Sequence, residues 1–192
     1  MKHPLYCLLI LAAVLVAGCA STGTGVNPAA RRQGWAQPCQ VNGVENCFML
    51  EAGLYRSAQP TTLGIKNLEE MGVTNLLSLR MTSTDNLLAS STMMSCHTVP
   101  ISYFHINEHS ILEAVKIMQS PKNRPLLVHC LHGSDRTGLV CATYRVLVQD
   151  WSKEEALAEM LEGGFGFHTC FTNIVEFIRN LDVEKARQQL KP

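Results

Sequence analysis

The stretch that decides the fold covers residues 125–138 and reads Pro125-Leu126-Leu127-Val128-His129-Cys130-Leu131-His132-Gly133-Ser134-Asp135-Arg136-Thr137-Gly138. Its first four residues form a short apolar run that predicts a buried strand. From Thr137 to Gln149 the apolar residues recur in a pattern that predicts a helix. Between these elements, five residues separate Cys130 from Arg136. The sequence therefore predicts a loop that joins a strand to a helix N-terminus.

The predicted loop has the composition of an anion site. Five residues let the backbone curl with its N–H groups inward, and such a nest at a helix N-terminus binds anions. Gly133 permits a positive φ, and Arg136 carries a planar guanidinium that can bind two phosphate oxygens at once. Thr137 can place a hydroxyl near the sulfur. We therefore expect the rest of the phosphate site to come from Leu131, His132, Gly133, Ser134 and Thr137.

Cys130 lies where this field acts on its thiol. Inward N–H groups and a helix N-terminus both favour the thiolate over the thiol. A thiolate is a suitable nucleophile for a covalent phospho-cysteine intermediate, so the predicted chemistry is attack on a phosphomonoester. His129 can orient the loop from its base. Zinc would require further ligands at Cys/His spacing besides His129, Cys130 and His132, so we expect no metal and no cofactor.

Length and charge limit the other possibilities. The chain has 192 residues, 16 Lys and Arg against 16 Asp and Glu, and a formal net charge of 0. This length suits one domain with a substantial core. With no basic excess, the composition does not indicate a nucleic-acid partner.

The N-terminus has the pattern of an export signal. Lys2 and His3 precede an apolar run over residues 5–16, which predicts a signal peptide over residues 1–18. The segment Leu15-Val16-Ala17-Gly18-Cys19 resembles a bacterial lipobox. This resemblance implies cleavage before Cys19 and attachment of lipid, including a palmitoyl chain, to Cys19. By the same resemblance Ala20 favours the outer membrane where the host has two membranes. We therefore expect residues 19–38 to be a flexible tether at the cell envelope and residues 39–192 to be the catalytic domain.

Six cysteines belong to the expected catalytic domain, and an exported chain meets an oxidising compartment in which disulfides form. Cys39 and Cys47 flank a Gly- and Asn-rich stretch and are candidates for a stapled loop. Unpaired thiols are the alternative, because a sequence does not establish connectivity. Cys141, on the predicted helix, has the pattern of a small core residue.

Strands and helices alternate along the domain. We expect strands at 54–58, 73–79 and 98–101 besides the strand before Cys130. We expect helices at 60–71 and 110–119, a helix after the capping box Ser152–Glu155, and a terminal helix or helix pair at 171–190. Residues 82–95 are polar and indicate a loop with some helix. The pattern predicts an α/β fold with a central, mostly parallel sheet flanked by helices.

At this point the chain resembles the cysteine-dependent dual-specificity and tyrosine phosphatases. The signature is residues 129–138, and two further segments, residues 54–60 and 76–80, resemble the atypical branch best known from plants and fungi. The likeness covers roughly residues 50–180. It implies Cys130 as the nucleophile and Arg136 as the phosphate-binding arginine.

The proton donor departs from the family pattern. Many relatives carry an Asp on a loop before the helix that precedes the signature, but residues 102–110 contain no Asp and offer Glu108 with His105 and His109. Asp135 is the alternative, because the Asp-Arg-Thr-Gly pattern resembles lipid phosphatases whose loop Asp has that role. We expect Asp135 to be the acid, keep Glu108 as the second candidate, and interpret Asp85 as a loop residue.

The substrate is the least determined part. Leu131, Ser134 and Asp135 add no positive charge to the loop, which favours a phosphorylated protein or a simple phosphomonoester over a highly charged polyanion. The resemblance keeps phosphoinositides and inositol phosphates or pyrophosphates as alternatives. A catalytically silent phosphate-binding lipoprotein is the alternative from outside the enzymes, although Cys130 and Arg136 together argue against it. Arg56, Arg80 and the Gly-rich loop with Phe165 and His168 are further residues expected near the site.

Overall fold

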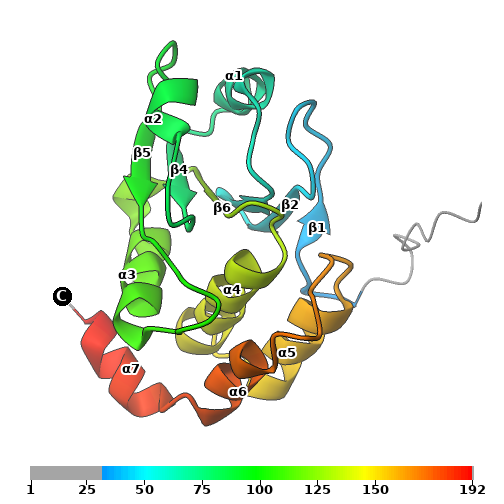
Figure 1. Cartoon of the computed structure of the whole chain (residues 1–192), viewed down its shortest axis with the longest axis vertical. Coiled ribbons are helices and arrows are strands. Elements are labelled where there is room, and N and C mark those ends of the chain that lie inside the picture. The colour runs from blue at the N-terminus through cyan, green and yellow to red at the C-terminus, as the bar shows by residue number, and fades with distance from the viewer. Residues whose placement is uncertain (1–31, 192) are drawn as a thin grey trace, which may run out of the picture.

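The computed structural model describes residues 32–191 (Figure 1). Six strands form one mixed sheet in the order β1-β2-β3-β6-β4-β5. Neighbours from β3 to β5 run parallel, whereas β1 and β2 are joined to the sheet as antiparallel strands. The strands are β1 (Gln37–Pro38), β2 (Phe48–Glu51), β3 (Leu54–Ser57), β4 (Asn75–Ser78), β5 (Ser95–Thr98) and β6 (Leu126–His129). The predicted α/β fold with a mostly parallel central sheet is confirmed.

Helices cover both faces of this sheet (Figure 1). On one face lie α1 (Thr62–Glu70) and the short α2 (Asp85–Leu88). On the other lie α3 (Glu108–Gln119), α4 (Asp135–Val148), α5 (Lys153–Glu162), α6 (Thr172–Asn180) and α7 (Val183–Leu190). A short 3₁₀ helix, η2 (Pro121–Asn123), leads from α3 into β6.

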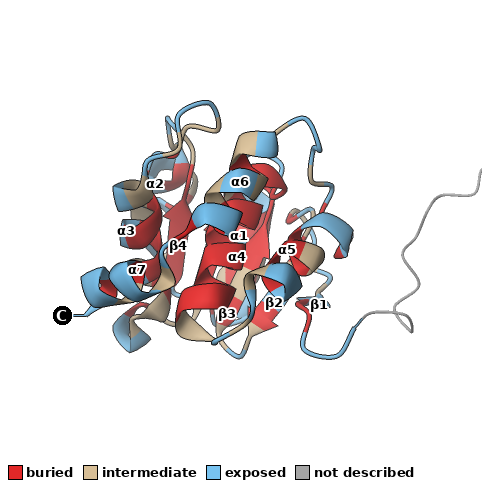
Figure 2. Cartoon of the chain, turned by 90° about the horizontal axis from the view of Figure 1, so that it is seen from below, coloured by how far each residue is buried: buried red, intermediate tan, exposed pale blue. Residues whose placement is uncertain are grey.

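The strand and helix on either side of the loop form the centre of the molecule. All four residues of β6 are buried, because the strand lies between β3 and β4 and is covered on both faces. Leu126 and Val128 join the larger core under α3 to α7, and Leu127 joins the smaller core under α1. Twelve of the 14 residues of α4 are buried (Figure 2). The loop between these elements is therefore held by the most buried parts of the fold.

The folded part begins earlier than the predicted boundary at residue 39. Ala36 is fully buried and Trp35 nearly so, and β1 starts at residue 37. The Ala36 N–H donates to Glu159 Oε1 at 2.6 Å, and the Glu159 carboxylate also forms a buried ion pair with Arg145 of α4 at 2.7 Å. Residues 35–38 have no strand or helix pattern and follow the Gly- and Pro-containing segment that predicts the tether, but the hydrogen bond from Ala36 to Glu159 holds them on the core.

The structure corrects two further expectations. The strand expected at 98–101 lies at Ser95–Thr98, because Pro100 has no N–H and cannot continue a regular ladder. Its polar, partly exposed residues gave no hydrophobic signal. Strands β1 and β2 were not predicted at all: β1 consists of two exposed residues, whereas β2 is a short run whose first three residues are apolar. By contrast the capping box of Ser152 and Glu155 is present at the start of α5, as predicted.

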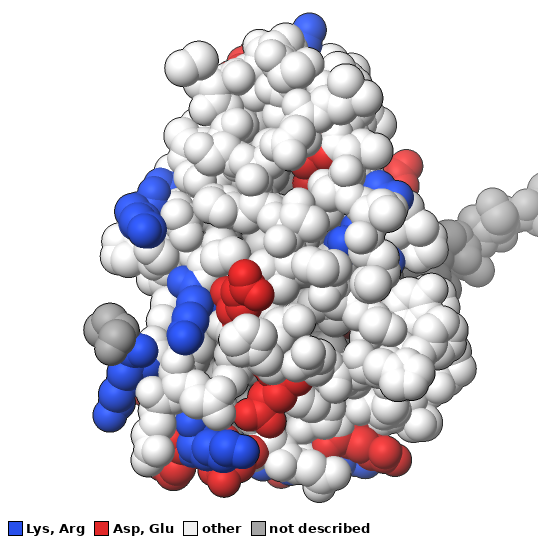
Figure 3. Space-filling view, turned by 60° about the vertical axis from the view of Figure 1, so that its left-hand side comes forward, with Lys and Arg blue, Asp and Glu red and all other residues white. Residues whose placement is uncertain are grey.

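The predicted signal peptide, the lipidated Cys19 and most of the tether lie outside the described residues. Within residues 32–191, none of the helices has the length and apolar character required to cross a bilayer. Cys39 and Cys47, the two candidates for a stapled loop, are free thiols whose sulfur atoms lie 2.7 Å apart. On the face shown in Figure 3, positive and negative side chains are interspersed rather than segregated by sign.

Candidate active site

The site lies beyond the carboxyl end of β6, where the loop over residues 130–134 leads into α4. Parallel strands place their carboxyl ends at one edge of a sheet, and ligands of α/β folds bind there. Cys130 is 3% exposed and forms the floor of the loop. The structure thus places the predicted nucleophile at the strand–helix junction that the sequence indicates.

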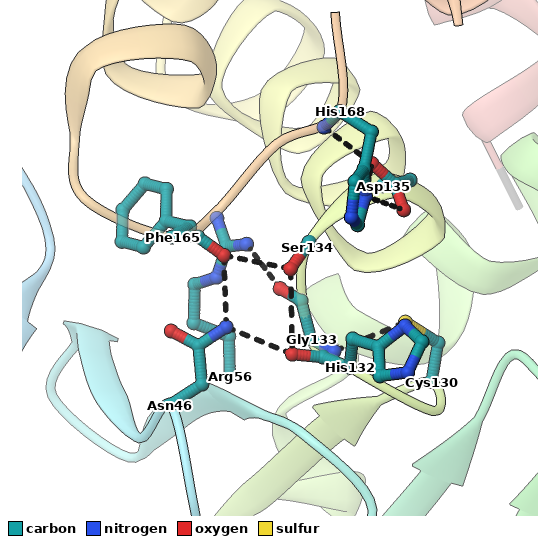
Figure 4. Close-up of polar contacts among 9 residues, drawn as sticks. All are labelled: Asn46, Arg56, Cys130, His132, Gly133, Ser134, Asp135, Phe165 and His168. Atoms are coloured by element: carbon teal, nitrogen blue, oxygen red, sulfur yellow. Dashed lines mark hydrogen bonds and ion pairs between the residues drawn. The ribbon is translucent and has the colours of Figure 1, made fainter. Parts of the chain in front are cut away.

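Three donors and the ring of His129 contact the loop carbonyls on the outer side of the loop. The Leu131 carbonyl accepts the Gln59 N–H at 3.1 Å, and the His132 carbonyl accepts the Asn46 side-chain amide at 2.9 Å. Arg56 Nη2 donates to the Gly133 carbonyl at 2.6 Å (Figure 4). The fourth carbonyl belongs to Cys130 and lies 3.1 Å from the His129 ring.

These outward carbonyls determine where the N–H groups point. In a trans peptide the C=O of one residue and the N–H of the next point in opposite directions. Carbonyls fixed outward at residues 130–133 therefore turn the N–H groups of residues 131–134 toward the inside of the loop. The Gly133 N–H lies 3.3 Å from Cys130 Sγ, as this geometry requires. The loop backbone is therefore arranged in the way that the predicted anion nest requires.

Gly133 is required by its own geometry. Its φ is +74°, in the left-handed region that favours glycine. A Cβ added there would lie 2.5 Å from the Ser57 carbonyl carbon at the end of β3. The loop is therefore seated directly on the backbone of the neighbouring strand.

A cavity of about 210 Å³ opens above Cys130. Arg136 lies at its wall, with its guanidinium 5.1 Å from the centre of the Tyr103 ring, and it has no ion pair within residues 32–191. This leaves the predicted phosphate-binding arginine available for a ligand. The lining also includes Leu131, His132, Asp135, His168, Cys170 and Phe171.

Two loop side chains turn away from the cavity. Ser134 Oγ donates to the Phe165 carbonyl at 2.7 Å, so this residue can reach a ligand only through its backbone. Thr137 is fully buried, and its Oγ1 has no hydrogen-bond partner among the described residues. The hydroxyl contact with the Cys130 sulfur that the sequence predicts for Thr137 is therefore not formed among the described residues.

Asp85 supports the loop from below. Its carboxylate lies 2.8 Å from His129 Nε2 and accepts the Gln59 side-chain amide at 2.9 Å. Burial raises the pKa of Asp85, but its hydrogen bonds and the facing His129 ring outweigh burial, and the net pKa is lowered. This carboxylate is 1% exposed, so it is a positioning group for His129 and not the simple loop residue that we expected.

The two candidate acids lie in different places. Asp135 lines the cavity above Cys130, where its carboxylate contacts His168. Glu108 lines another depression, together with Phe104, Asn173 and Glu176. The structure brings Asp135 to the nucleophile and does not bring Glu108 there.

Sequence reasoning missed several supports of the site. Asn46 holds a carbonyl that is 86 positions away along the chain, and Asp85 holds a ring 44 positions away. No local pattern marks such residues. Arg56 and Phe165 were expected nearby, and Arg56 indeed stacks on the Phe165 ring at 3.7 Å while it holds Gly133. Arg80 donates to Gln59 and lines an adjoining depression that shares Arg136 with the cavity.

Comparison with known proteins agrees with this geometry. A family model described as the tyrosine phosphatase family matches residues 44–191, which is most of the described chain. The chain belongs to the tyrosine phosphatase family. It is a cysteine-dependent phosphatase, and Cys130 and Arg136 lie within the matched residues.

Two kinds of relatives are found by sequence. The chain is 31% identical over 160 residues to the dual specificity protein phosphatase TpbA of Pseudomonas aeruginosa, which covers 83% of this chain and 72% of that protein. It is 25% identical over 156 residues to the inositol diphosphatase DSP3 of Arabidopsis thaliana, with 76% and 74% covered.

Solved structures give the same two kinds. A crystal structure of P. aeruginosa TpbA in complex with pTyr matches with a TM-score of 0.75 and 28% identity, over 83% of this chain and 98% of that one. The core catalytic domain of the PP-IP phosphatase SIW14 from S. cerevisiae, in complex with citrate, matches with a TM-score of 0.68 and 25% identity, over 80% and 98%.

Proposed function

We propose that this phosphatase hydrolyses phosphomonoesters through a phospho-cysteine at Cys130. The thiolate attacks phosphorus and forms the S–P bond while the bond to the leaving oxygen breaks. The leaving oxygen takes a proton from the acid at Asp135. Water then attacks phosphorus, gives up a proton to the same group, which now acts as the base, and the S–P bond breaks. Inorganic phosphate leaves and the thiolate is restored.

The observation that carries this proposal is the outward fixation of the four loop carbonyls. It directs N–H donors at the place where phosphate oxygens would gather charge, directly above Cys130. Donors fixed in advance supply much of the rate in such reactions. Arg136 adds a guanidinium with no competing ion pair within residues 32–191.

For the substrate, we propose a phosphorylated protein side chain or a small phosphomonoester. Within residues 32–191, Arg136 is the one Lys or Arg that lines the cavity. The other lining side chains with polar atoms are His132, Asp135, His168, Tyr103, Cys130 and Cys170. A polyanion would require more compensating charge than one arginine offers. An inositol phosphate or diphosphate is the second candidate, because relatives such as DSP3 are inositol diphosphatases and Arg80 lies in the adjoining depression.

The test is hydrolysis of an aryl phosphate in the presence of a metal chelator. Wild type should turn over, and Cys130→Ser should lose essentially all activity because an alcohol is a poor nucleophile at neutral pH. Cys96→Ser, on the partly exposed strand β5, is the matched control and should keep wild-type activity. Equal rates for wild type and Cys130→Ser would reject the mechanism.

A substrate panel then separates the two candidates. It compares phosphotyrosine peptides, phosphoinositides, inositol phosphates and inositol diphosphates at matched concentration. We expect the highest kcat/KM with the peptides. A preference for inositol diphosphates that Arg80→Ala abolishes would establish the second candidate instead.

We also propose that the protein is a lipoprotein that acts at the cell envelope, on the outer membrane where the host has two. The lipobox-like segment before Cys19 and the apolar run over residues 5–16 support this location. Cys19→Ser should release the protein from the membrane fraction and abolish labelling by a palmitate analogue, whereas Cys7→Ser should do neither. A membrane-bound, unlabelled wild type would contradict lipidation.

A further inference from the structure

Asp135 and His168 form a close pair at the rim of the cavity. The His168 backbone N–H donates to Asp135 Oδ1 at 2.9 Å, and His168 Nδ1 lies 3.0 Å from Oδ2 and 3.1 Å from Oδ1 (Figure 4). Both carboxylate oxygens of Asp135 are therefore engaged by one residue. The family signature does not include His168, which lies 33 positions further along the chain.

The loop that carries His168 is fixed to the phosphate loop. Ser134 Oγ and the Asn46 side-chain amide both donate to the Phe165 carbonyl, at 2.7 and 2.9 Å. Gly166, with φ +75°, turns the chain back so that residue 168 reaches Asp135. The imidazole is thus held by the same contacts that shape the phosphate site, and it does not lie on an unsupported loop.

The two members of the pair differ in exposure. The Asp135 side chain is 12% exposed and the His168 side chain 54%, and both line the cavity above Cys130. The carboxylate is therefore the inner member and the imidazole the outer member. With Nδ1 turned to Asp135, the other ring nitrogen, Nε2, has no hydrogen-bond partner among residues 32–191.

This arrangement resembles a carboxylate that orients a catalytic imidazole. The hydrogen bond made by one ring nitrogen determines which proton the other can transfer, and a carboxylate at Nδ1 stabilises the imidazolium. In such a pair the imidazole exchanges protons with the substrate, whereas the carboxylate stays ionised. Among residues 32–191, Asp135 carries the one carboxyl group in the cavity lining, and His168 contacts both of its oxygens. A carboxylate that orients the imidazole would have this arrangement.

We propose that His168 is a further catalytic residue and that it moves the proton through Nε2, with Asp135 as its orienting partner. The proposal rests on the phospho-cysteine mechanism above. In the first step the Nε2 proton passes to the leaving oxygen as the P–O bond breaks, and the imidazole becomes neutral. In the second step Nε2 takes a proton from the attacking water as the S–P bond breaks, and the imidazolium is restored. The Nδ1 proton stays between the two partners throughout.

The experiment measures His168→Gln against a series of aryl phosphates whose leaving phenols differ in acidity. A phenol that leaves readily as an anion needs no proton, whereas a poor leaving group does. We expect kcat/KM, which reports the first step, to fall about 10²-fold with phenyl phosphate, within the range of general acid catalysis, and by only a few-fold with p-nitrophenyl phosphate. Asp135→Asn should show the same dependence, and the double variant should lose little more than either single variant.

Controls separate this role from a structural one. The backbone N–H of residue 168 still donates to Asp135 in the Gln variant, so only the imidazole is removed. His109→Gln, on the exposed start of α3 and outside the cavity, is the matched control and should behave as wild type. Thermal unfolding of each variant checks the fold.

Failure of the His168 proposal and failure of the proposed phosphatase function give different results. If His168→Gln keeps the wild-type dependence on the leaving group, the proposal is overturned while the Cys130 mechanism stands. If His132→Gln shows the expected dependence instead, the proton comes from the other histidine of the cavity, whose ring centre lies 6.3 Å from that of His168. If wild type does not cleave p-nitrophenyl phosphate at all, the proposed function itself fails.

Discussion

Replacement of Gly133 by Ala tests whether the phosphate loop is seated on the end of β3. Gly133 has φ +74°, and a Cβ there would lie 2.5 to 2.6 Å from the backbone of Ser57 and Ala58. Gly72, after α1, has φ +92°, but a Cβ there meets nothing within 4 Å. Gly72→Ala is therefore a matched control that has the backbone strain without the collision.

The magnitudes follow from these two environments. A left-handed conformation costs a non-glycine residue about 1–2 kcal/mol, so Gly72→Ala should lower the free energy of unfolding by that amount. Gly133→Ala has the same strain and an overpacking cost of about 1–3 kcal/mol in addition. The collision is with backbone, so the loop would have to retreat, and a misplacement of about 1 Å costs about 10²-fold in rate.

The assay combines urea unfolding with hydrolysis of p-nitrophenyl phosphate. We expect Gly72→Ala to keep wild-type kcat, and Gly133→Ala to be the less stable variant and to lose about 10²-fold in kcat. If both variants lose the same stability and both keep wild-type kcat, the loop is not seated on β3, and the reasoning about its geometry is refuted.

Three further predictions concern stability and the cysteines. Glu159→Gln should lower the free energy of unfolding by about 3–5 kcal/mol, because it breaks the buried ion pair between Arg145 of α4 and Glu159 of α5. Glu162→Gln, at the exposed pair with Arg32, should change it by less than about 1 kcal/mol, and equal effects of the two variants in urea unfolding would contradict this. Because the pKa of Asp85 is lowered in the fold, its carboxylate stabilises the protein at pH values above the ordinary Asp pKa and ceases to do so as pH falls. The difference in free energy of unfolding between wild type and Asp85→Asn should therefore shrink below about pH 4, and a difference that stays constant with pH would argue against it. Oxidised glutathione should accept two electrons from Cys39 and Cys47 and form their disulfide, seen as loss of two hydrogens in the peptides that carry them; a lasting glutathione adduct on Cys39 or Cys47 would be the contrary result.

The sequence was sufficient for the parts of the site that lie close together in the chain. The strand, loop and helix around Cys130 have strong local signals, since the apolar run, the Gly position and the Cys-to-Arg spacing all lie within 14 consecutive residues. The parallel sheet also followed from alternating elements. These features depend on periodicity and turn chemistry, which a single sequence contains.

The supports of the site could not be found in the same way. Asn46 and Asp85 act on the loop through single hydrogen bonds across long sequence separations, and neither lies in a recognisable pattern. The edge strands β1 and β5 are polar and short, so burial left no periodic trace in them. His168 was expected near the cavity, but its pairing with Asp135 depends on how the Gly-rich loop turns.

The central claim is that phosphate is transferred to the sulfur of Cys130, and it is tested most directly by trapping that species. Wild type that is turning over an aryl phosphate would be quenched rapidly in denaturant and digested for peptide mass spectrometry. We predict one phosphoryl group on the peptide that contains Cys130, and none after the same treatment of Cys130→Ser. Steady turnover with no phosphoryl group on Cys130 at any quench time, together with activity in Cys130→Ser, would contradict the account.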